Sequence, residues 1–103
     1  MKVSYTRTGG FAPIPVTCAL DTNALTPDEA RELERLVTVS GIMHAQSRTN
    51  PAARDVRLHS IKVNSGEANK EIEWDDISIP PEARALIQFL QERAKTIFGD
   101  EED

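Results

Sequence analysis

The residues best suited to chemistry are four carboxylates in one short segment. Glu71 and Glu73 share one face of a predicted strand, and Asp75 and Asp76 follow it. Paired carboxylates can transfer protons or bind a cation. A solvated strand face whose charge is balanced by Lys62 and other basic residues explains the same pattern. The sequence favours this second interpretation, because it contains no EF-hand spacing.

Histidine and cysteine add little to this set. His44 and His59 are the two histidines, and no His/Cys cluster has the spacing of a zinc site. We interpret His59 as a packed sheet residue beside Trp74, and His44 as a loop residue. Cys18 stands among alternating apolar residues, which is typical of a small buried side chain. No nucleophile elbow, P-loop or dinucleotide fingerprint is present, so we expect no catalytic site, metal or cofactor.

Length and charge restrict the possible partners. The 103 residues match one domain, which we place at residues 1–99, with an acidic, disordered tail at 100–103. The tail carries −4 of the net charge of −5. The absence of a basic patch or a long apolar run argues against nucleic acid and membranes as partners. The start of the chain has no apolar signal-peptide core, so we expect the cytoplasm, with leaderless export left open.

Two alternating segments near the start predict a hairpin. Residues 2–8 and 13–20 both have a period of two, and pairing Val3 with Cys18 and Tyr5 with Val16 keeps their apolar faces together. That register leaves residues 9–12 as the connecting loop. Pro15 has no N–H to donate, so the second strand is predicted either to lie at an edge or to be irregular at Pro15.

The rest of the chain predicts two helices and a second hairpin. The sequence Thr-Pro-Asp-Glu at 26–29 is a capping box, and Gly41 is a natural helix end. Residues 43–54 form a long irregular loop. A last helix is expected from Pro80 to Gly99, with apolar residues at helical spacing as far as Ile97.

The second predicted hairpin joins residues 55–63 to residues 70–75 around a turn that contains Gly66. Pairing Ile61 with Ile72 places His59 opposite Trp74 and Lys62 opposite Glu71. Val56 and Leu58 are out of phase with Ile61 and Val63, which calls for either a bulge near His59 or a strand that is apolar on both faces at one end. The predicted fold class is therefore α+β, in the order ββ-α-ββ-α, with a four-stranded antiparallel sheet and both helices on one face.

Several blocks in one order resemble the emfourin family. They are residues 4–12, which end in Thr-Gly-Gly-Phe-Ala, and residues 20–22, 25–30, 70–76 and 79–86. Together they span nearly the whole chain. The resemblance implies a small bacterial protein that inhibits protealysin-like metalloproteases, with a fold of antiparallel sheet and helix–loop–helix unit. It also implies an inhibitor that carries no zinc of its own, because the metal belongs to the enzyme.

We expect the inhibitory contact at the first hairpin tip, in Gly9, Gly10, Phe11 and Ala12, and we expect a monomer. Phe11 either meets the partner or folds back as a lid on the core, and small neighbours let the backbone approach a cleft. The 43–54 loop is the other candidate contact. The alternative function is a non-catalytic adaptor that binds a peptide along the strand edge at Pro15. An enzyme would need chemistry from Glu71, Glu73, Asp75 or His59.

Overall fold

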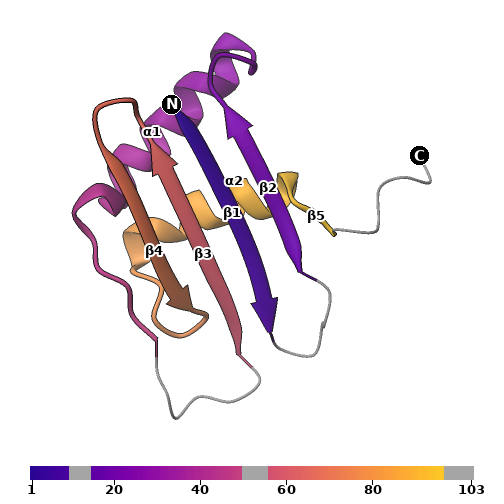
Figure 1. Ribbon diagram of the computed structural model, residues 1–103, viewed down its shortest axis with the longest axis vertical. Helices are drawn as coiled ribbons and strands as arrows, with labels where there is room; N and C mark the ends of the chain where they lie inside the picture. Colours follow the sequence, from indigo (N-terminus) through magenta and orange to yellow (C-terminus); the bar gives the residue numbers. More distant parts are fainter. Residues whose placement is uncertain (10–14, 50–55, 97–103) are drawn as a thin grey trace.

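The computed structural model describes residues 1–9, 15–49 and 56–96 (Figure 1). The elements are β1 (Lys2–Gly9), β2 (Val16–Asp21), α1 (Pro27–Ser40), the 3₁₀ helix η1 (Ile42–His44), β3 (Arg57–Asn64), β4 (Asn69–Asp75), the 3₁₀ helix η2 (Pro81–Ala83), α2 (Arg84–Arg93) and β5 (Lys95–Thr96).

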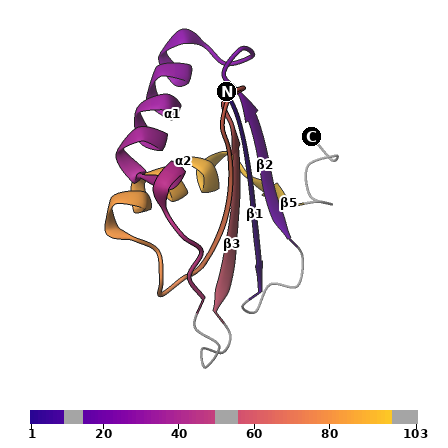
Figure 2. The ribbon, with the colours of Figure 1, turned by 60° about the vertical axis from the view of Figure 1, so that its left-hand side comes forward.

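The strands form one antiparallel sheet in the order β4-β3-β1-β2-β5. Both helices cover the same face of this sheet (Figure 2). This arrangement confirms the predicted α+β class and the four antiparallel strands β1 to β4. The uncovered face carries mostly short or charged side chains, among them Ser4, Thr17, Lys62 and Glu71, as the alternation predicts.

The first hairpin has a different register from the predicted one. Tyr5 lies opposite Cys18 and Val3 opposite Leu20, a shift of two residues. A shift of two leaves every side chain on its expected face, because side chains alternate along a strand. The second strand begins at Val16, after Pro15, whose ring leaves no N–H for the ladder. Pro13 and Ile14, which were expected in this strand, lie outside the described residues.

The second hairpin has the predicted register. Ile61 lies opposite Ile72, and the pairing runs residue for residue from Leu58 to Asn64 without a bulge. Leu58 is half-buried on the uncovered face, whereas His59 is buried on the covered face. Of the two explanations for the phase conflict, the structure therefore selects a strand that is apolar on both faces at one end.

The first helix begins and ends where the sequence predicts. The Thr26 hydroxyl accepts a hydrogen bond from the Glu29 N–H at 3.2 Å, and Gly41 ends the helix at a φ of 68°. The last helix is shorter than predicted and ends at Arg93. Ala94 is extended, and the chain continues as β5 along β2. No helix in the described ranges has the length and hydropathy needed to cross a membrane.

Because α2 ends early, the chain after it can pair with the edge of the sheet. Lys95 pairs with Thr17 and Thr96 with Val16, so backbone groups at the start of β2 gain hydrogen-bond partners. A longer helix would leave these groups without partners. The helix end is itself stabilised by the Arg93 guanidinium, which donates to the Phe89 carbonyl at 3.0 Å. Ile97, expected on the helix, lies outside the described residues.

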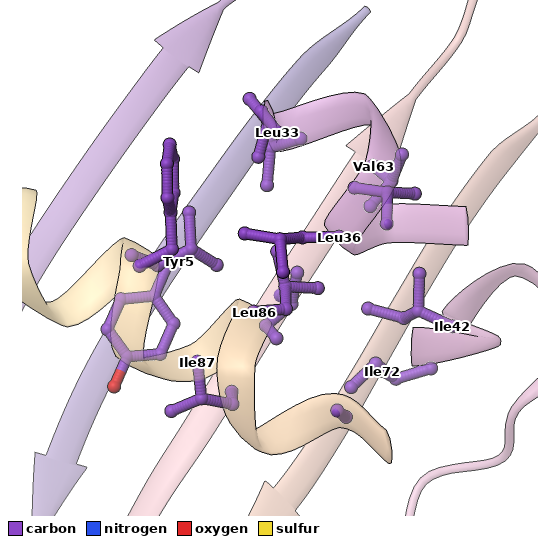
Figure 3. Close-up of a cluster of buried hydrophobic side chains, with 14 of the residues drawn as sticks. Tyr5, Leu33, Leu36, Ile42, Val63, Ile72, Leu86 and Ile87 are labelled. Carbon is purple, nitrogen blue, oxygen red and sulfur yellow. The ribbon is translucent and has the colours of Figure 1, made fainter. Parts of the chain in front are cut away.

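The core lies between the sheet and the two helices. Side chains from β1, β3 and β4 meet those of α1 and α2 in one cluster (Figure 3). Six helix residues that the spacing predicts to face the core are buried there, namely Leu33, Leu36, Val37, Leu86, Ile87 and Leu90. Of their predicted sheet partners, Cys18, Ile61, Ile72 and Trp74 are buried, and Val16 is half-buried.

Replacing Leu90, which has no exposed surface, with alanine should leave a cavity in this core. We expect Leu90→Ala to lower the free energy of unfolding by ~2–5 kcal/mol, measured by urea denaturation. Val39→Ala is the matched control, because Val39 is 53% exposed on α1 and should change stability by less than about 0.5 kcal/mol. A loss well below 1 kcal/mol for Leu90→Ala would mean that the core closes around the missing atoms.

Candidate functional site

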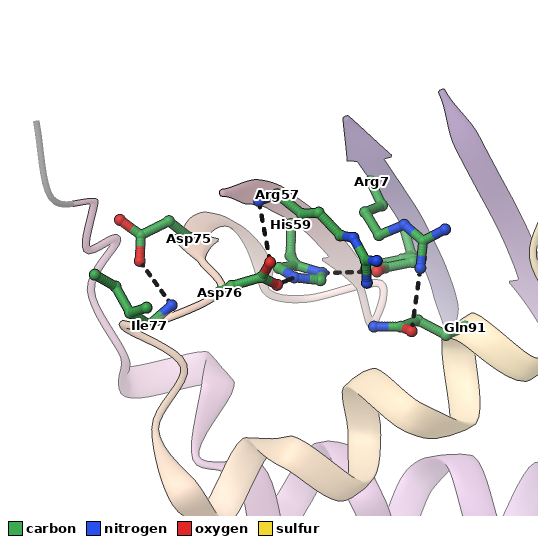
Figure 4. A network of polar contacts seen from close by, with 8 residues as sticks. Arg7, Arg57, His59, Asp75, Asp76, Ile77 and Gln91 are labelled. Carbon is green, nitrogen blue, oxygen red and sulfur yellow. Dashed lines mark hydrogen bonds and ion pairs between the residues drawn. The ribbon is translucent and has the colours of Figure 1, made fainter. Parts of the chain in front are cut away.

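A chain of polar side chains runs from the middle of the sheet to the turn after β4 (Figure 4). The Tyr5 hydroxyl lies 2.7 Å from His59 Nδ1, and His59 Nε2 lies 2.5 Å from Asp76 Oδ1. The second oxygen of Asp76 accepts the Arg57 backbone N–H at 3.1 Å. Tyr5 and His59 are buried, so this chain connects the interior of the domain to its surface.

The hydrogen bonds assign the protons in this network. A carboxylate at Asp76 only accepts, so His59 Nε2 donates to it. In the neutral ring, Nδ1 then accepts from the Tyr5 hydroxyl. Burial raises the pKa of Tyr5 to about 12, which keeps that hydroxyl protonated. Burial alone would also raise the pKa of Asp76, but the hydrogen bonds from the His59 ring and the Arg57 backbone N–H, together with the positive charge of the Arg57 side chain, hold it below its usual value.

A pocket of about 360 Å³ lies beside this network. Its lining residues are His59, Asp76, Ile79, Arg84, Ile87, Gln88 and Gln91. The Arg7 guanidinium donates to the Gln91 side chain at 3.2 Å, which ties β1 to α2 next to the pocket. The lining includes no hydroxyl or thiol nucleophile, and both ring nitrogens of His59 already have partners. The pocket is therefore better suited to binding than to covalent catalysis.

The four carboxylates do not gather into one site. Glu71 lies opposite Lys62, and Glu73 accepts a hydrogen bond from Ser60, both on the uncovered face of the sheet. Asp75 is buried and accepts the Ile77 N–H. Asp76 belongs to the histidine network. In the part of the chain that the structure describes, no three His, Cys, Asp or Glu side chains are placed to hold a metal ion.

The histidines and the cysteine lie where they serve packing and hydrogen bonding or are exposed to solvent. His44 ends the 3₁₀ helix η1 and is exposed. Cys18 is buried, and burial raises the pKa of its thiol, which makes it a poor nucleophile. This confirms the interpretation of Cys18 as a core residue. His59 is packed beside Trp74 as predicted, but its polar partners were not foreseen, because Tyr5 is 54 positions away in the chain.

Only the first residue of the predicted hairpin tip is described. Gly9 ends β1, whereas Gly10, Phe11 and Ala12 lie outside the described residues. Gly9 has a φ of 87°, and a Cβ atom there would lie 2.9 Å from the Val56 carbonyl oxygen. Glycine at this position is thus required by the close approach of the chain before β3.

The first part of the predicted 43–54 loop is fixed against β4. The Trp74 indole N–H donates to the Gln46 carbonyl at 2.9 Å, and the Glu73 N–H donates to the Ser47 hydroxyl at 2.8 Å. Arg48 forms a parallel bridge with Trp74. These contacts protect the outer edge of β4, a role that the sequence did not indicate. Residues 50–54 of this loop lie outside the described ranges.

Comparison with known proteins identifies the family. A sequence profile described as Emfourin matches residues 5–91 of the 103-residue chain. The chain belongs to the emfourin family. This confirms the resemblance seen in the ordered sequence blocks. Emfourins are an inhibitor family, so membership implies a metalloprotease-inhibitor role. The comparison with curated proteins and that with solved structures gave no match.

The Asp76 carboxylate of this emfourin should make a pH-dependent contribution to stability. Its pKa is lowered by folding, so the contribution is complete above the unfolded value of about 4 and is lost as pH falls through the folded value. We expect Asp76→Asn to be less stable than the wild type at pH ~7, with a smaller difference at pH ~3. Urea denaturation at both pH values measures this, with Glu71→Gln on the uncovered face as the control. If the stability difference between the wild type and Asp76→Asn were the same at both pH values, the lowered pKa of Asp76 would be contradicted.

Proposed function

We propose that this chain inhibits a thermolysin-like zinc metalloprotease of the protealysin type by covering its active-site cleft. The observation that carries the proposal is the family match over residues 5–91, which runs from β1 almost to the end of α2. The chain supplies steric occlusion in this proposal, and the enzyme supplies the zinc. A closely packed sheet and helix layer supports such a role, because a rigid inhibitor loses little conformational entropy on binding.

The proposed contact is the end of the sheet where β1 stops and β3 starts. Gly9 pairs with Arg57 there, so the last residue of β1 and the first residue of β3 lie side by side. We assign the inhibitory contact to Gly9, Gly10, Phe11 and Ala12. Thermolysin-like enzymes favour a large apolar side chain just after the cleaved bond, and Phe11 has that character. A buried aromatic anchor of this kind is a common source of binding energy.

The adaptor alternative is less well supported by the geometry. Addition of a peptide strand would require a free edge near Pro15. β5 already pairs with Val16 and Thr17, the first residues of β2. Two pockets on the outer face of the sheet are lined mostly by polar and charged residues, among them Lys62 and Glu71.

A protease panel tests the proposal directly. Purified full-length chain is titrated against thermolysin-like enzymes, including a protealysin-like one, and against serine proteases. We expect reversible, roughly one-to-one inhibition within the first group and little effect on the second. Absence of inhibition across the thermolysin-like group at micromolar concentration would reject the function and return the adaptor to consideration.

Truncation of Phe11 tests the assigned contact. We expect Phe11→Ala to weaken inhibition by about 2 kcal/mol, which is roughly 30-fold in the inhibition constant, with an unchanged unfolding temperature. Val39→Ala, which removes an exposed apolar side chain from α1, serves as the control. A parallel loss of stability and inhibition would instead make Phe11 a lid on the core, and unchanged inhibition would exclude it from the contact.

A further inference from the structure

Ile77 is an apolar side chain that the fold leaves in water. It is 61% exposed, and Val39 is the other large apolar residue with comparable exposure in the described ranges. Its neighbours in the turn after β4 are different: Asp75 and Ile79 are buried. Exposed turns usually carry polar residues, and Ile77 does not pack against the core cluster. The packing of the domain therefore does not account for an isoleucine at this position.

The turn that carries Ile77 is held at several points. The Ile77 N–H donates to Asp75 Oδ1 at 3.1 Å, and the Ser78 N–H donates to the Asp75 carbonyl at 3.0 Å. The Asp76 N–H donates to the Arg57 carbonyl at 3.0 Å, and the Asp76 carboxylate binds both the Arg57 N–H and His59. Figure 4 shows the bond from Ile77 to Asp75 and, beside it, the bonds of Asp76 to Arg57 and His59. The backbone of the turn is thus fixed, so a partner that buries Ile77 has to order little more than this one side chain.

The turn lies at the same end of the sheet as Gly9, the described residue of the proposed inhibitory contact. Arg57 pairs with Gly9 on one side and exchanges hydrogen bonds with Asp76 on the other. Gly9, Arg57 and Asp76 therefore follow one another across the same end of the sheet. Figure 1 shows the end of β1, the start of β3 and the turn after β4 at this one end. A partner that covers this end of the sheet at Gly9 would approach Ile77 as well.

We infer that Ile77 is a second apolar anchor of the inhibitory surface and enters an apolar recess beside the protease cleft, an inference that rests on the proposed function. The recess must be apolar, because the gain comes from removing an exposed aliphatic side chain from water. Two contacts from separate turns would also fix the orientation of the inhibitor over the cleft. A complex with two such contacts has a defined orientation, whereas a single loop held in a pocket does not fix how the inhibitor lies over the cleft.

The test compares matched pairs of variants in the full-length chain. Ile77→Ala and Ile77→Asp are measured against a metalloprotease that the wild type inhibits, with Val39→Ala and Val39→Asp as controls at the other exposed apolar residue. We expect the inhibition constant to rise about tenfold for Ile77→Ala and further for Ile77→Asp. Both Val39 variants should inhibit like the wild type. Unfolding temperatures of all four should stay close to that of the wild type, because both sites are exposed.

The outcomes separate the two proposals. If the wild type inhibits the protease and the inhibition constant of Ile77→Asp lies within twofold of the wild-type value, the anchor is overturned. The proposed function then stays in place. An equal loss in Val39→Asp would also overturn the anchor, because the effect would then not depend on position. If the wild type inhibits no thermolysin-like enzyme, the proposed function fails first and the anchor with it. If Ile77→Asp lowers the unfolding temperature, Ile77→Ala alone decides, and its unchanged inhibition would overturn the anchor.

Discussion

The antiparallel pairing of β1 with β3 joins the two hairpins into one sheet, and the arrangement of the sheet end at Gly9 and Arg57 follows from it. β1 pairs along its whole length, from Lys2 opposite Asn64 to Gly9 opposite Arg57. This register places Tyr5 next to Ile61 and within reach of His59. It also brings the end of β1 to the start of β3, at the close approach that only glycine at position 9 allows. A slip of one residue would turn the buried face of β1 to solvent.

The polar network at this end of the sheet is buried but satisfied. Buried polar side chains are costly without partners, and every buried side-chain nitrogen and oxygen in the described residues has one. Tyr5, His59 and Asp76 obtain their partners from one another and from the backbone of Arg57. Such a closed network favours one geometry over its alternatives. Its effect is to fix the turn after β4 relative to β3, and not to leave a group free for catalysis.

An inhibitor of this kind depends on shape more than on reactivity. The described residues place the chemistry-bearing side chains in structural roles: Cys18 in the core, Glu71 and Glu73 on a solvated face, and His59 within a network. The proposed function instead uses the rigid presentation of the sheet end. The edge of β4 is protected by the segment around Arg48 and the start of β2 by β5, so neither edge is open for pairing at these positions.

The sequence by itself determined the features that depend on short-range geometry. The cap at Thr26, the stop at Gly41 and the pairing of Ile61 with Ile72 follow from local spacing, because periods of two and 3.6 residues and turn chemistry act over a few positions. The ordered blocks also gave the family. The tertiary structure decided the register of the first hairpin, since alternation cannot distinguish a shift of two residues. It also decided where α2 ends, at Arg93, and that His59 contacts Asp76 and Tyr5. Both depend on which groups, distant in the chain, still lack a hydrogen-bond partner when the elements pack together.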